Sequence, residues 1–513
     1  MKTAPIQIVR PAENQSSITK GRRWSALIVL MLPVLLVSVD NTVLSFAVPS
    51  IARALEPTGT QQLWIIDSYS LVLAGLLVPM GSLGDRIGRK KLLLIGSTGF
   101  AVISVLAAFA PSAGWLIAAR AVLGFFGAML MPSTLSLIRN IFINPNERRT
   151  AIAVWAAMFS GGAALGPIVG GFLLEHFDWG SVFLMSVPVL VPFLICAPFL
   201  IPESKDPNPG PVDVVSILLV MAAMTPTVFA IKHFAEIGMD LIGPLALIIG
   251  AVCMWLFVRR QLRRSIPMLD VILFRNKVFT GAILANLLNI LSMTGFIFFV
   301  SQHLQLVSGL TPMEAGIFLI PGLALTIVAG LLIVRVVRRV HPAVIIAVAL
   351  LINGVGYLIV ALTDNAATNA GLMIAFILLG AGVGAGETIS NDLMLSSVPA
   401  EKAGAASAIS ETSYEVGAVL GTAVLGGILT AVYRLNVDIP AELNEAQAVS
   451  AHETLGGASQ VAQQVGGDAG AQLLNSAQHA FDSGVVWTSA ISVVIMVVAA
   501  LQTYVMVRGA KTE

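Results

Sequence analysis

The sequence predicts an all-α integral membrane protein with 14 transmembrane helices, arranged as six, two and six, and with both termini in the cytoplasm. Three observations predict this fold class: the composition, the apolar runs and the placement of basic residues. Of the 513 residues, 57% are hydrophobic and only 11% are charged, whereas a soluble domain carries about 25% charged residues. The chain therefore holds enough apolar sequence for on the order of fourteen bilayer crossings of about 20 residues each.

The apolar runs give the predicted spans directly. They cover residues 25–48, 62–80, 92–110, 114–137, 150–173, 181–201, 213–231, 241–258, 279–303, 314–334, 343–363, 370–394, 404–432 and 485–507. The first run is too long for the core of a signal peptide, and no persuasive cleavage site follows it. We therefore interpret it as an uncleaved first helix.

Basic residues predict the orientation. On alternate loops lie 25 of the 29 lysines and arginines, while the opposite side holds only Arg53, Lys232 and Arg434, and Arg120 falls inside a span. Loops rich in lysine and arginine face the cytoplasm. Both termini are therefore expected on the cytoplasmic side of the membrane.

The predicted domains follow from this count and from a weak internal repeat. The loop Gly81–Lys91 between the second and third spans corresponds to the loop Arg335–Pro342 between the tenth and eleventh spans, eight helices later. Six helices, two extra helices and six helices would produce this offset, and paired six-helix bundles around a central site are a transporter architecture. The divisions are a cytoplasmic tail at 1–24, a first bundle at 25–201, two extra helices with their loops at 202–278, a second bundle at 279–507 and a tail at 508–513.

Two longer connections leave alternatives open. Residues 433–484, on the outside between the last two spans, form either a short helical hairpin or a mobile loop. Residues 259–278 combine arginines with Ile266, Met268 and Leu269, which fits an interfacial amphipathic helix or simply a basic anchor for topology.

Several function classes are excluded by the composition and the missing motifs. A net charge of +1 argues against a nucleic-acid-binding protein. Cys196 and Cys253 both lie in apolar runs, so neither a disulfide framework nor a thiolate metal site is credible. Without a phosphate-binding loop or a zinc-protease motif, we predict no catalytic residue, no metal and no cofactor, and no use of ATP.

Two glycine-containing segments are candidate conformational elements. In the loop after the second span, glycines permit a tight turn and charged residues can form a latch between helices. The alternative is a solvated basic loop that only sets the topology. The residues of this loop are Gly81, Asp85, Arg86, Gly88 and Arg89. In the fifth span, small residues share one helical face and a proline bends the helix. General helix packing is an alternative explanation for such glycines. The residues of this segment are Gly162, Gly166, Pro167, Gly170 and Gly171.

Ionisable groups within the spans are the candidate coupling residues, because a charge at bilayer depth costs roughly 2.5–3.5 kcal/mol. Asp40, Asp67 and Arg120 lie at middle to outer depth of the first bundle, where we expect them to meet. An arginine favours the ionised carboxylate, and loss of the contact favours the protonated one, which makes a proton switch. A permanent structural ion triad is the alternative.

A second acidic group lies in the second bundle. Glu411 and Glu415 are four residues apart and share a helical face. Since two like charges in a low dielectric repel each other, at least one is expected to hold a proton until a lipophilic cation binds. Glu387 follows a glycine-rich stretch and is either a further proton site or a partner for exposed backbone groups.

Aromatic and methionine side chains near these charges suggest an adaptable apolar lining for organic cations. They are equally common as core residues of helical bundles. The candidates are Trp64, Tyr69, Met129, Trp155, Met158, Phe159, Phe296, Phe299 and Tyr414.

Several motifs together resemble a known family. The loop Gly81–Lys91 resembles the signature of the major facilitator superfamily, with Gly84 in place of an alanine, and Gly166–Gly171 resembles the antiporter motif of its exporters. The segments Asp40–Val43, Leu63–Leu71 and Met131–Ser136 are similar to those of the fourteen-helix drug:proton antiporter family. That family includes exporters of the QacA, LfrA and SmvA types.

The resemblance implies a function and roles for residues. Asp40 matches the essential first-helix carboxylate, Asp67 an acid of the second helix, and Glu411 and Glu415 the acids of the thirteenth helix. Gly322 and Leu323 stand where QacA-type pumps carry a further acid linked to dications, which favours monovalent substrates.

We therefore expect a multidrug efflux antiporter, driven by the proton motive force, that acts as a monomer among membrane lipids. Its substrates would be lipophilic cations such as quaternary ammonium compounds, ethidium and acriflavine. The alternative is a proton-coupled exporter of one endogenous metabolite, lipid or antibiotic.

Overall fold

The computed structural model describes residues 19–205, 213–236, 240–265, 267–362, 369–398 and 403–509. Within these ranges, all of the regular secondary structure is helical. Lys2, Arg10, Ile266, Lys402 and Lys511, which entered the predictions above, lie outside the described residues.

The expected all-helical membrane fold is confirmed. In the described chain, 13 helices are long and apolar enough to cross a bilayer, and counting the bent helix α6 as one span gives 14. The first six predicted spans correspond to α1 (Lys20–Leu55), α2 (Gly59–Ile87), α3 (Arg89–Ala108), α4 (Ala113–Gly127) with α5 (Leu130–Ile141), α6 (Pro145–His176), and α7 (Ser181–Leu184) with α8 (Ser186–Leu200).

The two extra helices and the second bundle follow in the expected order. The extra helices are α9 (Val214–Glu236) and α10 (Ile242–Arg263), followed by the 3₁₀ turn η1 (Val271–Arg275). The second bundle comprises α11 (Lys277–Gln302) with η2 (His303–Val307), α12 (Pro312–Phe318) with α13 (Ile320–Val336), α14 (Pro342–Leu362), α15 (Asn369–Ser396), α16 (Ala403–Leu420) with η4 (Gly421–Gly426) and α17 (Gly427–Asn436), and α20 (Gly467–Val507).

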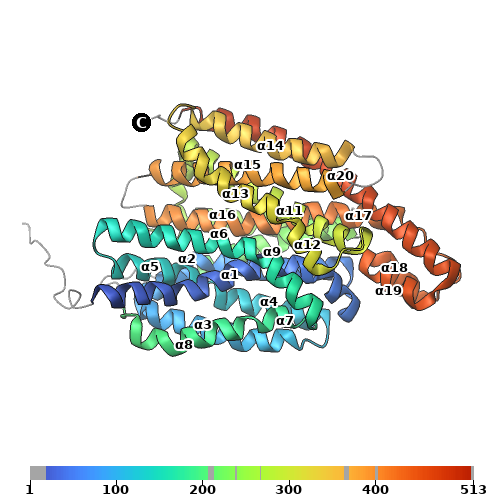
Figure 1. Cartoon of the computed structure of the whole chain (residues 1–513). Coiled ribbons are helices and arrows are strands. Elements are labelled where there is room, and N and C mark those ends of the chain that lie inside the picture. Colours follow the sequence, from blue (N-terminus) through green and yellow to red (C-terminus); the bar gives the residue numbers. More distant parts are fainter. Residues whose placement is uncertain are drawn as a thin grey trace, which may run out of the picture.

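The long helices run roughly side by side, and α1 begins at the same end of the molecule at which α20 ends (Figure 1). We call this the basic end, because the α2–α3 turn with Arg86 and Arg89 lies there. The opposite end carries the short helices α18 (Glu445–Glu453) and α19 (Leu455–Val465), and we call it the hairpin end. The assignment of the basic end to the cytoplasm stays a prediction.

Of the two alternatives for residues 433–484, the structure has the helical hairpin. Helix α19 packs through Leu455 and Val461 against Leu473 of α20, and α18 packs against α19. Helix α20 itself begins at Gly467, earlier than the predicted start at 485. The helix is longer than the predicted span at 485–507 because the amphipathic sequence before residue 485 is helical without being apolar enough to resemble a span.

Of the two alternatives for residues 259–278, the described residues do not form the interfacial amphipathic helix. Helix α10 continues only to Arg263, and the one further element is the short η1. The side chain of Gln261 accepts hydrogen bonds from the backbone N–H groups of Met268 (2.9 Å) and Leu269 (3.2 Å). These bonds hold the chain in a turn that a helix would exclude.

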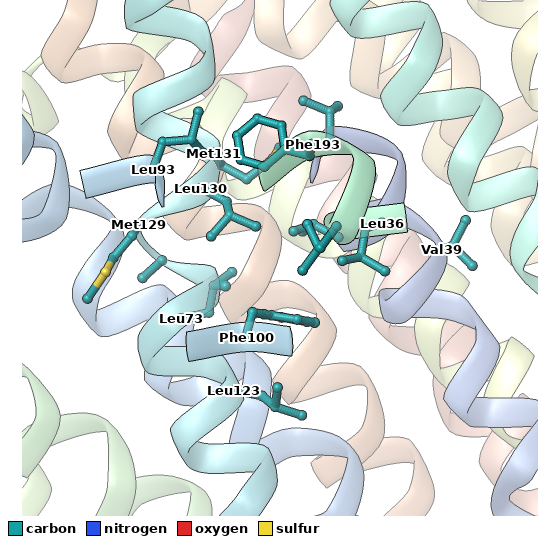
Figure 2. Packing of buried hydrophobic residues seen from close by; sticks show 14 of the residues in the cluster. Leu36, Val39, Leu73, Leu93, Phe100, Leu123, Met129, Leu130, Met131 and Phe193 are labelled. Atoms are coloured by element: carbon teal, nitrogen blue, oxygen red, sulfur yellow. The ribbon is translucent and has the colours of Figure 1, made fainter. Parts of the chain in front are cut away.

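The first bundle has a continuous apolar core. In Figure 2, Phe100 of α3 and Leu123 of α4 lie close to Leu73 of α2, and Leu93 and Met131 lie near Phe193 of α8. Lipid tails are as apolar as these side chains, so moving a side chain from lipid into the protein core gains little free energy. Close packing between helices must therefore stabilise the bundle.

The closest packing in the first bundle joins α1 and α6. A Cβ atom at Gly162 would meet Ser38, and one at Gly166 would meet Thr42. Helix α6 bends by 40° near Pro167, whose ring nitrogen cannot donate to the carbonyl of Ala163. The Thr42 hydroxyl donates to that carbonyl instead (3.1 Å), so α1 both fits the glycine face and satisfies the bend.

A pair of neighbouring glycines tests this packing. Gly166→Ala should lower the free energy of unfolding by about 1–3 kcal/mol, because the added methyl overlaps Thr42. Gly161→Ala is the matched control, since a Cβ there meets nothing within 4 Å. Thermal unfolding in detergent measures both; equal melting temperatures for the two variants would contradict the tight α1–α6 contact.

Candidate transport site

A buried ion pair joins Asp40 of α1 to Arg120 of α4. Arg120 Nη1 lies 2.8 Å from Asp40 Oδ2, and the side chains are only 2% and 6% exposed. The same guanidinium donates from Nε to the carbonyl of Ile65 (3.2 Å) and lies over the Tyr69 ring, 4.4 Å from its centroid. Arg120 is thus held from three sides, and the expected meeting of Asp40 and Arg120 is present.

Asp67 does not join this pair, so the expected triad is wrong. Its carboxylate oxygen Oδ2 lies 2.9 Å from Nζ of Lys232, and both side chains are almost fully buried. The prediction failed because depth along a helix does not fix the direction in which a side chain points. Asp67 faces α9, whereas the Arg120 guanidinium lies over Tyr69.

Lys232 is the functional residue that sequence reasoning missed. The predicted seventh span ended one residue before it, which placed Lys232 in an outer loop, but α9 continues to Glu236. A usable signal was present: Lys232 is one of only three basic residues on the predicted outer side and directly follows an apolar run.

The acids of the second bundle face the first bundle. Glu415 is 5% exposed and lies within hydrogen-bonding reach of Ser70 of α2 and Asn41 of α1. Glu411, one turn closer to the basic end, is partly exposed and experiences the charge of Arg139 at the end of α5. Among the described residues, neither glutamate forms an ion pair with a lysine or arginine.

Glu387 on α15 belongs to the same region. It is partly exposed, and it acts electrostatically on Tyr414, as does Glu415. The alternative role would require hydrogen bonds from backbone N–H groups to Glu387, and none is present among the described residues. Two carboxyl groups, those of Glu387 and Glu415, therefore lie near Tyr414 at the boundary between the bundles.

Aromatic rings cross this boundary. Trp155 and Phe159 of α6 are stacked, with ring centroids 6.0 Å apart, and Phe159 meets Tyr414 of α16 edge to face, also at 6.0 Å. Trp155 Nε1 donates to the Thr134 hydroxyl (3.2 Å). These three rings provide the aromatic faces near the acids that an organic cation requires.

The other candidate lining residues have different positions. Met129 is buried in the core of the first bundle (Figure 2), and Met158 packs partly buried against that core. Phe296 and Phe299 are buried among Tyr357 and Phe376 in the second bundle, with the Phe296 and Phe299 centroids 4.9 Å apart. For Met129, Phe296 and Phe299 the core alternative therefore holds, while Tyr69 supports Arg120 and Trp64 lies beside Lys232.

In the glycine-containing loop at the basic end, Asp85 of α2 pairs with Arg89 of α3, while the role of this contact as a latch stays a prediction. Arg89 Nη2 lies 2.6 Å from Asp85 Oδ1. Gly88 has φ +114°, a conformation that favours glycine, and a side chain there would also overlap Glu203. Glu203, after α8, accepts hydrogen bonds from the backbone N–H groups of Lys90 (3.0 Å) and Lys91 (3.2 Å), which stabilises the first turn of α3.

The recorded side-chain contacts between the bundles are concentrated toward the hairpin end. Ser301 donates to the carbonyl of Ser45 (2.9 Å), and Gln62 donates to Gln302 (3.2 Å). A Cβ atom at Gly171 would meet the backbone of Met313, so α6 and α12 touch closely there. The hairpin adds a hydrogen bond from the Gly59 N–H to Glu453 (3.0 Å). The structure is therefore closed at the hairpin end.

A metal centre finds no support in this region. In the residues that the structure describes, no group of three or more histidine, cysteine, aspartate or glutamate side chains has a geometry that would hold a metal ion.

Two helical bundles with buried ionisable side chains within and between them are the architecture of a membrane transporter. The family model of the Major Facilitator Superfamily matches residues 30–422. The chain belongs to the Major Facilitator Superfamily, and it is a multi-pass protein of the bacterial plasma membrane.

Individual relatives agree with this assignment. The chain is 55% identical to the multidrug efflux pump LfrA of Mycolicibacterium smegmatis, over 94% of this chain and 96% of that protein. It is 34% identical to the methyl viologen resistance protein SmvA of Salmonella typhimurium, over 92% and 94% of the two chains. A solved bacterial homologue of the lysosomal transporter Spinster, inward-facing and unoccupied, matches with TM-score 0.67 at 18% identity over 96% and 98%, which shows the shared fold.

The support of α3 by Glu203 gives a second prediction. Glu203→Ala should lower the free energy of unfolding by about 1–2 kcal/mol, because the N–H groups of Lys90 and Lys91 lose their acceptor at a helix start. Glu175→Ala, an exposed glutamate of α6, is the control. Denaturation monitored by tryptophan fluorescence measures both, and an unchanged midpoint for Glu203→Ala would contradict the role assigned to this carboxylate.

Proposed function

We propose that this protein is a proton-coupled multidrug efflux antiporter that exports lipophilic cations. The observation that carries the proposal is the pair Glu411 and Glu415, with Glu387 nearby, lying beside Trp155, Phe159 and Tyr414 at the boundary of the bundles. Its similarity to LfrA, named as a multidrug efflux pump, supports the same function.

The chemistry follows from charge balance. A carboxylate in a low dielectric needs a proton, a fixed cation or a bound cation. Asp40 has Arg120 as its fixed cation, whereas within the described residues Glu411 and Glu415 have none. A lipophilic cation that enters from the basic end and lies on the aromatic faces replaces the protons of these two acids. Proton loading from the opposite side then releases it.

Asp40 supplies the conformational side of the coupling. Its ion pair with Arg120 joins α1 to α4 within the first bundle. Protonation of Asp40 removes the carboxylate's charge and weakens the attraction to Arg120, which allows α1 to move. Each ligand shifts the balance between inward- and outward-facing states only by its difference in affinity for the two.

The driving force favours more than one proton per substrate. Exchange of one proton for one monovalent cation moves no net charge and gains about 1.4 kcal/mol per pH unit, or tenfold accumulation. Two protons move one net charge and gain about 5 kcal/mol at one pH unit and 100 mV, which corresponds to several thousand-fold. Two adjacent glutamates match the larger requirement.

Monovalent cations are the proposed substrates. A further acid on α13 would not fit at position 322, because a Cβ atom on Gly322 would overlap Phe376 and the adjacent Leu323 is buried. SmvA, however, is named for resistance to methyl viologen, a dication, so a substrate panel should contain both classes. Protection against one compound alone would favour the alternative, a specific metabolite, lipid or antibiotic exporter.

Drug-triggered proton release tests the coupling. Adding ethidium or benzalkonium to purified, weakly buffered protein should release protons, and Glu411→Gln should reduce both the number released and the affinity for the cation. Glu175→Gln, remote and exposed, is the control. If Glu411→Gln releases as many protons as the unmodified protein, the coupling does not use this acid.

Asp40→Asn should abolish uphill ethidium efflux, at least tenfold in rate, because the amide can neither exchange a proton nor hold Arg120 as an ion pair. Efflux from energised inverted vesicles with matched protein levels measures it. Downhill exchange of substrate without a proton gradient should persist. Near-normal uphill export by this variant would disprove the proposed role of Asp40.

A further inference from the structure

Helix α9 lies along α2 through one continuous stripe of contacts. On α2 the stripe consists of Trp64, Asp67, Leu71 and Gly75, spaced three or four residues apart. Opposite them on α9 lie Lys232, Val228 and Met221 in the reverse order. The stripe spans twelve residues of each helix, or eleven steps of about 1.5 Å, which is about 16 Å.

The contacts within this stripe are directional. Lys232 Nζ lies 2.9 Å from Asp67 Oδ2 and 4.0 Å from the centroid of the Trp64 ring. At the other end of the stripe, a Cβ atom on Gly75 would overlap Met221, so the methionine occupies the space that the glycine leaves. An ion pair at one end and a side chain in a glycine notch at the other fix the register of the two helices.

Helix α9 contacts the second bundle differently. Val228, which faces Leu71 in the stripe, also lies in one small apolar cluster with Val419 of α16 and Ala423 of η4, and α9 lies beside α17 as well. These smooth aliphatic side chains define no single register. Thr422 of η4 lies within hydrogen-bonding reach of Asp67. The Asp67 carboxylate of α2 therefore lies close to both α9 and the second bundle.

Helix α10 is joined to α9 as one hairpin. At the basic end, Arg260 forms two hydrogen bonds with Asp213, at 3.0 and 2.9 Å, and they hold the pKa of Asp213 well below its usual range. A Cβ atom on Gly250 of α10 would overlap Thr227 of α9. Movement of α9 therefore carries α10 with it.

We propose that Lys232 is a positioning residue: through Asp67 it fixes α9 to α2, so that the hairpin α9–α10 moves with the first bundle and slides over η4, α17 and the adjoining end of α16. In this arrangement the hairpin covers the seam between α2 and α16 toward the lipid. The inference rests on the alternating-access cycle of the proposed function. It assigns Asp67 a role apart from proton exchange, in contrast to Asp40.

Burial of the charges explains why the pair works as a unit. Each partner neutralises the other, whereas removing one leaves an uncompensated buried charge. Removing both leaves an uncharged contact supported by the apolar stripe and the Gly75 notch. Single neutral variants should therefore be more harmful than the double one, which is the opposite of the pattern for two proton-exchanging groups.

Cross-linking shows which bundle α9 follows. In a parent with Cys196→Ser and Cys253→Ser, the pair Gly75→Cys/Met221→Cys joins α9 to α2. Treated with a short thiol-specific cross-linker, this variant should keep at least half of the parent's ethidium efflux. A parent that does not pump would refute the proposed function itself, before any statement about α9.

The matched pair Val228→Cys/Ala423→Cys joins α9 to the second bundle. Cross-linking should reduce its efflux at least tenfold, and a cleavable linker should restore it on reduction. Any other result, including harmless links at both contacts or inhibition at both, overturns the proposal that α9 moves with the first bundle.

Neutral variants test the role of Asp67. Asp67→Asn and Lys232→Met should each lower efflux at least tenfold, while Asp67→Asn/Lys232→Met should return to within about threefold of the unmodified protein and release the same number of protons per ethidium. A folded double variant that stays inactive, or that releases fewer protons, overturns the positioning role. If the double variant fails to fold, the cross-linking pattern decides.

Discussion

The cost of placing charge in a low dielectric organises this protein. Every buried ionisable side chain must be neutralised by a partner or by a proton. Asp40 and Asp67 meet this requirement with the fixed cations Arg120 and Lys232. Glu411 and Glu415 lie at the bundle boundary and have no such cation among the described residues. The same physical constraint therefore produces two kinds of acid, those paired with a fixed cation and those without one.

The membrane fold could be predicted well from the sequence, because the signals are long and repeated. Apolar runs of about 20 residues are hard to mistake, and even Arg120, the charge inside the fourth span, was placed correctly. The ends of helices were less predictable. Helix α9 extends past its apolar part to include Lys232, and α20 begins several turns before its apolar part. Hydropathy does not show where such polar ends of a helix lie.

The pairing of the charges could be predicted only in part. Depth placed Asp40, Asp67 and Arg120 in one layer, and two of the three do meet. The rotation of α2 about its axis decides that Asp67 points away, and that rotation depends on Lys232, which lies 165 residues further along the chain. Contacts between distant segments of this kind leave no local pattern in the sequence.

The length of α20 has a practical consequence. Its 41 residues extend about 60 Å, roughly twice the apolar thickness of a bilayer. The half beyond the apolar layer forms, with α18 and α19, a firm protrusion at the hairpin end (Figure 1). An antibody fragment bound to this protrusion would add mass in a fixed orientation to a protein otherwise hidden in its detergent belt, and would make its images alignable by electron microscopy.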